Sequence, residues 1–123
     1  MSNTLTTIQE VQVLICTPDG EKLKSEREAI DLIGEALQQG AQVIVIPVKR
    51  LNDDFFSLKT RIAGEIIQKF VTYRRQLVIL GDISRYVEQS KAFRDFVYET
   101  NRGIQVWFLR DFQELAERLK CMR

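Results

Sequence analysis

The sequence predicts one α/β domain, built on a mainly parallel sheet of four or five strands that is covered by helices. Four short apolar runs, rich in β-branched and aromatic residues, alternate with segments whose apolar residues have helical spacing. The runs are largely continuous, which is typical of strands buried on both faces. We therefore expect the order β-α-β-α-β-α-β-α over residues 1–123, with right-handed crossovers between parallel strands.

The predicted strands are the apolar runs themselves, at residues 11–16, 43–48, 77–80 and 104–109. Residues 4–10 precede the first run and are expected to add an edge strand. No internal repeat, low-complexity segment or composition shift divides the chain, so a single domain is expected.

Two helices are predicted between the first three runs. The first begins at the capping box Ser25-Glu26-Arg27-Glu28 and ends at Gly40, which suits the αL position. Its core face is predicted to be Ala29, Ile30, Ile33 and Leu37. The second covers about residues 57–73, and its buried stripe is predicted to be Leu58, Ile62, Ile66, Ile67 and Phe70.

Two more helices are predicted in the last third of the chain. One lies around residues 90–101 and ends in Asn101-Arg102-Gly103 as an αL stop. Its buried residues are predicted to be Phe93, Phe96 and Val97. The other starts at Asp111, with Glu114 at capping-box spacing, and is expected to bury Phe112, Leu115 and Leu119.

Composition excludes several kinds of chemistry. The chain has 123 residues and no histidine, so it has no Ser-His-Asp triad, no imidazole metal ligand and no imidazole pH switch. Cys16 and Cys121 stand far apart without CxxC spacing, so two free thiols are expected rather than a disulfide. We assign no catalytic residue and predict no metal and no cofactor.

Charge and hydropathy bear on compartment and partners. The formal net charge is +1, so no strong positive field favours specific nucleic-acid binding. The N-terminus lacks the pattern of a signal peptide, and no apolar run approaches the roughly 18 residues that span a bilayer. We therefore expect a cytoplasmic protein that has no membrane partner.

Polar residues follow each predicted strand and should gather at one sheet edge, where parallel α/β sheets bind ligands. Gly81-Asp82-Ile83-Ser84 is the most suggestive of these loops, since glycine allows close backbone approach. Asp82 or Ser84 either caps the next helix or binds a polar ligand. Asp53-Asp54 is readable as a cation or phosphoryl site, or as carboxylates that favour a helix N-terminus.

Longer motifs carry a family resemblance. They are the stretch at residues 54–70, the loop at 81–84 and the run at residues 98–103. With them, almost the whole chain resembles a bacterial family catalogued as domain of unknown function 4180. That resemblance implies kinship and no particular activity.

A second resemblance concerns architecture. The strand at residues 43–47, an irregular link and a helix with Ala63-Gly64-Glu65-Ile66 look like the middle of STAS domains, the fold of anti-sigma-factor antagonists. In STAS domains a hydroxyl residue at the start of this helix can be phosphorylated, which switches partner binding. The resemblance places Ser57 and Thr60 there, although the chain lacks the usual Asp-Ser-Ser-Gly run. The alternative is that Ser57 or Thr60 only caps the helix.

These observations leave three functional hypotheses. The first is a non-catalytic, STAS-like regulatory module that binds an unidentified protein partner. The second is a small-molecule or anion-binding domain, or a histidine-free enzyme, with its site at the strand-end loops. The third is a homo-oligomer that pairs through aromatic residues such as Tyr86, Tyr98 or Trp107. The candidate binding residues are Lys59, Thr60, Asp82, Ser84, Arg85, Asn101 and Arg102.

Overall fold

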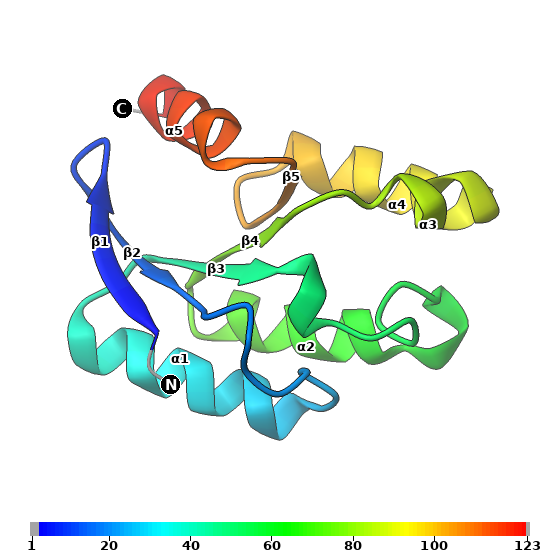
Figure 1. Cartoon of the computed structure of the whole chain (residues 1–123), viewed down its shortest axis with the longest axis horizontal. Coiled ribbons are helices and arrows are strands. Elements are labelled where there is room, and N and C mark those ends of the chain that lie inside the picture. Colours follow the sequence, from blue (N-terminus) through cyan, green and yellow to red (C-terminus); the bar gives the residue numbers. More distant parts are fainter. Residues whose placement is uncertain (1–2, 123) are drawn as a thin grey trace.

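The computed structural model describes residues 3–122 as a small α/β domain with a five-stranded sheet (Figure 1). The strands are β1 (Thr4–Ile8), β2 (Val11–Ile15), β3 (Val43–Pro47), β4 (Gln76–Leu80) and β5 (Val106–Leu109), and they lie in this order across the sheet. β1 is antiparallel to β2, and all other neighbours are parallel. The predicted α/β class and the predicted edge strand are therefore confirmed.

Five α-helices and two short 3-10 helices connect the strands. The α-helices are α1 (Glu26–Gln39), α2 (Ile62–Thr72), α3 (Ser84–Gln89), α4 (Lys91–Arg102) and α5 (Phe112–Cys121). The 3-10 helices η1 (Val48–Arg50) and η2 (Leu58–Thr60) lie between β3 and α2. Among the described residues, no helix is long and apolar enough to cross a membrane.

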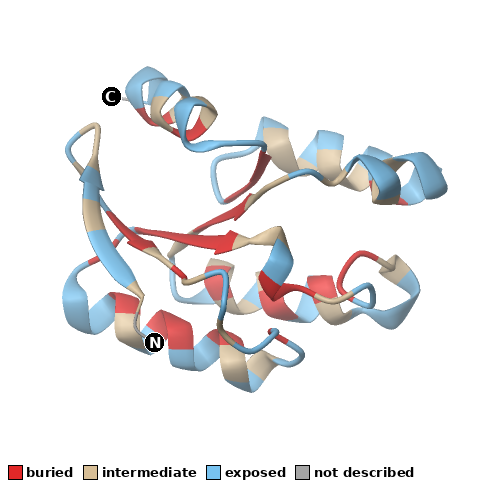
Figure 2. Cartoon of the chain, in the orientation of Figure 1, coloured by how far each residue is buried: buried red, intermediate tan, exposed pale blue. Residues whose placement is uncertain are grey.

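Side chains alternate between the two faces of the sheet and form two apolar clusters. On one face, even-numbered residues of β2 and β3 such as Leu14 and Ile44 pack with residues of α1, α2 and α4. On the opposite face, Val13, Val45 and Trp107 pack with α5. Parallel strands in sequential order with right-handed crossovers place their connecting helices on one face, which explains why α5 lies alone on the other. The central strands are almost fully buried, as Figure 2 shows.

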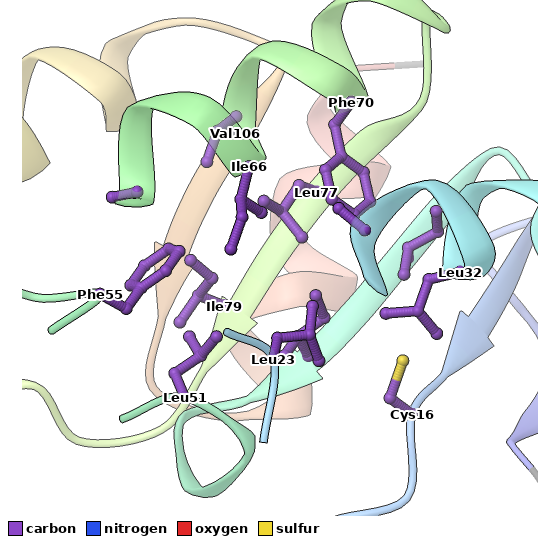
Figure 3. Close-up of a cluster of buried hydrophobic side chains, with 14 of the residues drawn as sticks. Cys16, Leu23, Leu32, Leu51, Phe55, Ile66, Phe70, Leu77, Ile79 and Val106 are labelled. Atoms are coloured by element: carbon purple, nitrogen blue, oxygen red, sulfur yellow. The ribbon is translucent and has the colours of Figure 1, made fainter. Parts of the chain in front are cut away.

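Two loops close the core at the carboxyl ends of the strands (Figure 3). Leu23 follows β2, Leu51 follows β3, and the two residues form a parallel β-bridge. Phe55 lies farther along the second loop and is completely buried. These apolar anchors hold the loops that carry the polar residues described below.

The helices differ from the prediction in two places. The predicted helix at residues 57–73 is interrupted at Arg61, whose φ of 63° places it in the left-handed region. The α-helix starts only at Ile62, and η2 precedes it. The short helix α3 was not predicted, and Ser90 separates it from α4 with an extended backbone.

Three predicted core residues are exposed. Ile30 and Leu37 are 40% and 44% exposed, because the buried stripe of α1 is centred on Ala29, Ile33 and Ala36 instead. Phe112 is 43% exposed, since it begins α5, which buries Leu115 and Leu119 as predicted.

The predicted helix caps have mixed outcomes. Gly40 ends α1 with a φ of 75°, and the Asp111 side chain accepts a hydrogen bond from Glu114 N, both as predicted. The Ser25 side chain makes no cap hydrogen bond to the backbone, because Glu28 instead accepts from Lys24 N and Ser25 Oγ. Gly103 has a φ of −86°, so the predicted αL stop is wrong.

Replacing one non-glycine residue at the end of α2 with glycine is expected to stabilise the protein. Arg74 follows α2 with a φ of 56°, a conformation that costs an L-residue about 1 kcal/mol relative to glycine. We expect Arg74→Gly to raise the free energy of unfolding by about 0.5–1 kcal/mol in urea titrations. The matched variant Gln38→Gly, inside α1, should lower it by a similar amount. A loss of stability in Arg74→Gly would contradict this account.

Candidate functional site

The carboxyl edge of the sheet brings together two segments that are far apart in sequence. Residues 48–61 follow β3, and α3 with the start of α4 follows β4. Their side chains line a pocket of about 650 Å³. The pocket is lined by Asp53, Asp54, Phe56, Ser57, Leu58, Lys59, Arg85, Tyr86, Gln89, Ser90 and Ala92. This set, called the 53–92 pocket below, contains the predicted site residues Ser57, Lys59 and Arg85.

An aromatic stack joins the two walls of the pocket. The rings of Phe56 and Tyr86 are nearly parallel, at 13°, with centroids 4.0 Å apart. Phe56 is 3% exposed and also contacts Phe55 and Phe93 edge to face. Offset or edge-to-face aromatic pairs contribute beyond their buried area, so this stack fixes α3 against the segment after β3.

A three-residue cluster of polar groups lies beside this stack. Asp53 Oδ1 accepts from Arg85 Nη2 at 2.9 Å and from the Tyr86 hydroxyl at 2.7 Å. Arg85 Nη2 also lies 2.6 Å from the Tyr86 hydroxyl, and its guanidinium carbon lies 4.6 Å from the centre of the Tyr86 ring. The Asp53 and Arg85 side chains are 79% and 66% exposed, so the pair is accessible to solvent and contributes little to stability by itself.

The cluster moves the pKa values of its acid and its phenol in opposite directions. The hydrogen bond from Tyr86, followed in importance by the charge of Arg85, lowers the pKa of Asp53. Burial, and then the hydrogen bond to Asp53, raise the pKa of Tyr86. At neutral pH, Asp53 is therefore a carboxylate and Tyr86 a neutral phenol.

The two predicted phosphorylation candidates have different surroundings. Thr60 Oγ1 lies 2.6 Å from Asp54 O and 2.8 Å from Ser57 O, and accepts from Ile62 N. This hydroxyl therefore closes the turn before α2. It is not a helix cap as the alternative expected, because the N-cap of α2 is Arg61, and Ser57, the N-cap of η2, makes no cap hydrogen bond with its side chain. Ser57 is half-buried and lines the pocket together with Lys59.

Asp82 and Ser84 form a turn and do not line the pocket. Asp82 Oδ1 accepts from Ser84 N at 2.9 Å and from Ser84 Oγ, and these bonds lower the pKa of Asp82. Gly81 has a φ of 140°, and a Cβ there would lie 2.9 Å from Val48 Cγ2. The close approach expected at Gly81 is thus made to η1, and Asp82 and Ser84 hold the turn into α3.

Asn101 and Arg102 lie at the opposite end of α4 from the pocket. Asn101 Nδ2 donates to Phe108 O at 3.2 Å, and Phe108 N donates to Asn101 Oδ1 at 2.7 Å. Backbone groups of Gln105 and Leu109 bond toward β4, so those of Phe108 face the outer edge of β5, and Asn101 satisfies them as a neighbouring strand would. Arg102 lies 3.8 Å from Glu99 on the surface.

Arg50 is a buried charged residue at this edge of the sheet that sequence reasoning did not single out. Its side chain is buried, and it donates from Nε to Glu21 O at 2.6 Å and from Nη1 to Thr17 O at 2.8 Å. A Cβ at Gly20 would lie 2.7 Å from the guanidinium, so glycine leaves room for it. The charge therefore anchors the loop after β2.

Other residues of the pocket were also missed. Tyr86 and Gln89 lie on α3, which the sequence did not predict, and Ser90 is the N-cap of the predicted helix α4 but was not proposed as a site residue. Asp53 was considered only as part of a cation or phosphoryl site or as a helix-start carboxylate. Within residues 3–122, no group of three or more acidic or cysteine side chains is placed to hold a metal ion.

The cysteines and aromatic residues also differ in their surroundings. Both cysteines are free, as predicted. Burial raises the pKa of Cys16 to about 12, so its thiol is protonated at neutral pH.

Trp107 is 1% exposed and donates a hydrogen bond to Gly103 O, so it cannot form the predicted oligomer contact.

The paired amide of Asn101 predicts a stability effect. Asn101→Ala would leave Phe108 N and O without partners, so we expect a loss of about 1–3 kcal/mol in the free energy of unfolding. The neighbouring variant Arg102→Ala should change it by less than about 0.5 kcal/mol. Equal losses in the two variants would contradict the role of the amide.

The Asp53 cluster predicts a pH dependence. Because the pKa of Asp53 is lowered by folding, its contribution to stability is present above the usual aspartate pKa and is lost as pH falls through the folded-state value. We expect Tyr86→Phe to raise the pKa of Asp53 toward its usual value in an NMR titration of the carboxyl carbons. The pKa of Asp82, which is lowered by its bonds to Ser84, should not change in that variant, and an unchanged pKa of Asp53 would contradict the assignment.

Searches of the curated proteins and of the solved structures found no match to this chain. A family model described as Domain of unknown function (DUF4180) matches residues 8–119. The match covers α1 to α4, most of α5 and all strands except most of β1, and it confirms the resemblance drawn from the sequence motifs. The chain therefore belongs to the DUF4180 family.

Proposed function

We propose that the protein is a non-catalytic binding module that holds an anionic group in the 53–92 pocket. The observation that supports this most is the convergence of Lys59 and Arg85 with three neutral hydrogen-bonding side chains, Ser57, Gln89 and Ser90. Two carboxylates also line the pocket, and one of them, Asp53, is bonded to Arg85 and Tyr86. Charge-assisted hydrogen bonds to carboxylate or phosphate oxygens are the contacts that such a set provides.

The backbone at the pocket supports the same ligand chemistry. Ser90 is the N-cap of α4, and its hydroxyl accepts from Phe93 N at 3.1 Å. The positive end of the α4 dipole therefore points toward the side of the pocket that Ser90 and Ala92 line.

The protonation states favour binding over acid–base catalysis. A general acid or base works best with a pKa near the operating pH. In this pocket the pKa of Asp53 is lowered and that of Tyr86 is raised, so both move away from neutrality. These two groups are suited to fixing charge and geometry rather than to moving a proton.

A STAS-like interaction module switched at Ser57 is the second candidate. Ser57 lines the same pocket as Lys59 and Arg85, so a phosphate on its hydroxyl would gain two nearby cations. Thr60 is less suited, because its hydroxyl already bonds to Asp54 O and Ser57 O. The two candidates differ in whether the anion is a ligand or Ser57 itself, and mass spectrometry of protein from its native cell distinguishes them.

Anion binding is tested by NMR titration of the whole chain with phenyl phosphate and with benzoate. We expect amide shifts at residues 53–59 and 85–92, and Arg85→Gln should weaken binding about tenfold through loss of a charge-assisted contact. Asp53→Asn should strengthen binding, since the Asp53 carboxylate competes for Arg85 Nη2 and the Tyr86 hydroxyl.

The control for this experiment is Arg102→Gln, which removes the same charge outside the pocket. It should leave the affinity within about twofold, because exposed charges at a distance are screened. Shifts that spread over the whole surface, or equal losses in Arg85→Gln and Arg102→Gln, would contradict a site in this pocket.

A further inference from the structure

The two edges of the sheet differ in whether their backbone groups are covered. At β5, the Asn101 amide satisfies the outward-facing N–H and C=O of Phe108. β1 is the opposite edge, and Figure 2 shows it largely exposed. Exposed edges pair readily with other strands unless charges, prolines or bulges prevent it. β1 consists of Thr4-Leu5-Thr6-Thr7-Ile8, without a charged residue or a proline, and its register with β2 has no bulge.

The register shows which β1 groups point outward. Gln42 N donates to Gln12 O and Cys16 N donates to Val45 O, so the even-numbered residues of β2 bond toward β3. The odd-numbered residues of β2 therefore bond toward β1, where their partners are Thr4, Thr6 and Ile8. The N–H and C=O groups of Leu5 and Thr7 consequently face away from the sheet.

We propose that a second copy of this chain pairs with β1, antiparallel and about a two-fold axis at Thr6. In this register Leu5 lies opposite Thr7 of the second copy, and the two residues exchange backbone hydrogen bonds. Thr6 then lies opposite Thr6 of the second copy in a non-hydrogen-bonded pair. The sheets of both copies become continuous through their β1 strands.

The strand itself indicates a second copy as the occupant. With the axis at Thr6, all five residues of one β1 strand find a partner in the β1 strand of the second copy, and Thr4 lies opposite Ile8. No charge is placed opposite a like charge. A contact about a two-fold axis uses β1 of both copies, so assembly through this strand stops at a dimer. Five residues from each copy form a small contact, so the dimer is weak and depends on concentration.

Disulfide trapping tests the pairing and its register. The variant Thr6→Cys is made together with Cys121→Ser, which leaves only the buried Cys16 as another thiol. Residues opposite each other in a non-hydrogen-bonded antiparallel pair have Cα atoms about 4.5 Å apart, within the range that a disulfide spans. We expect a cross-linked dimer under mild oxidation, formed faster at higher protein concentration.

The matched control is Thr7→Cys in the same background. Thr7 is more exposed than Thr6, but two Thr7 residues would lie two positions out of register. We expect Thr6→Cys to cross-link about tenfold faster, because Cα atoms more than about 7 Å apart cannot be bridged without backbone movement. Equal rates, faster cross-linking at Thr7, or no cross-linked Thr6→Cys dimer in folded protein would overturn the proposal.

Discussion

The contact between Phe56 and Tyr86 positions the candidate site. Phe56 belongs to the segment after β3 and is packed into the core through Phe55 and Phe93, whereas Tyr86 belongs to α3 after β4. Stacking the two rings brings the Tyr86 hydroxyl and the adjacent Arg85 to Asp53. The polar cluster thus depends on an apolar contact, because its own exposed ion pair is too weak to order two loops.

Polar side chains at the carboxyl edge of the sheet either bond to backbone groups or expose their charge beside the pocket, and residue type alone does not show which. Arg50 bonds carbonyls of the neighbouring loop, and Thr60 and Asp82 bond backbone groups of their own turns, so the chemistry of all three serves the fold. Lys59 and Arg85 expose their charges beside a pocket. This difference in bonding, rather than the number of polar residues, is the reason for proposing the 53–92 pocket as the binding site. Burial of Arg50 is informative here, because a buried guanidinium with two carbonyl partners has little freedom to serve a ligand.

The sequence was sufficient for the sheet, because its signal is regular. Continuous runs such as residues 43–48 are hydrophobic at every position, and only a strand buried on both faces accommodates this at such a length. Helix boundaries were less predictable near the site. Nothing local marks Arg61 as a left-handed residue, since its conformation follows from the packing of the 48–61 segment. Helix α3 was missed because its six residues contain no apolar stripe long enough to show helical periodicity.

Only some residues of the candidate site could be predicted from the sequence. Arg85 and Lys59 were expected at the correct sheet edge, since the topology of parallel strands places their loops together. Asn101 and Arg102 were also expected at this edge of the sheet. The sequence placed a helix between the third and fourth apolar runs, but it did not show which way the side chains of that helix point. The pairing of Asn101 with Phe108 depends on the distance between a helix end and a strand, which a single sequence does not contain.

The absence of histidine acquires a specific meaning at this pocket. The pKa of the acid at its centre is lowered and that of the phenol is raised, so the charges of Asp53 and Tyr86 do not change over the interval around neutral pH. An imidazole in the same place would change its charge within that interval. A pocket of this composition keeps the same electrostatic preference across the physiological range of pH.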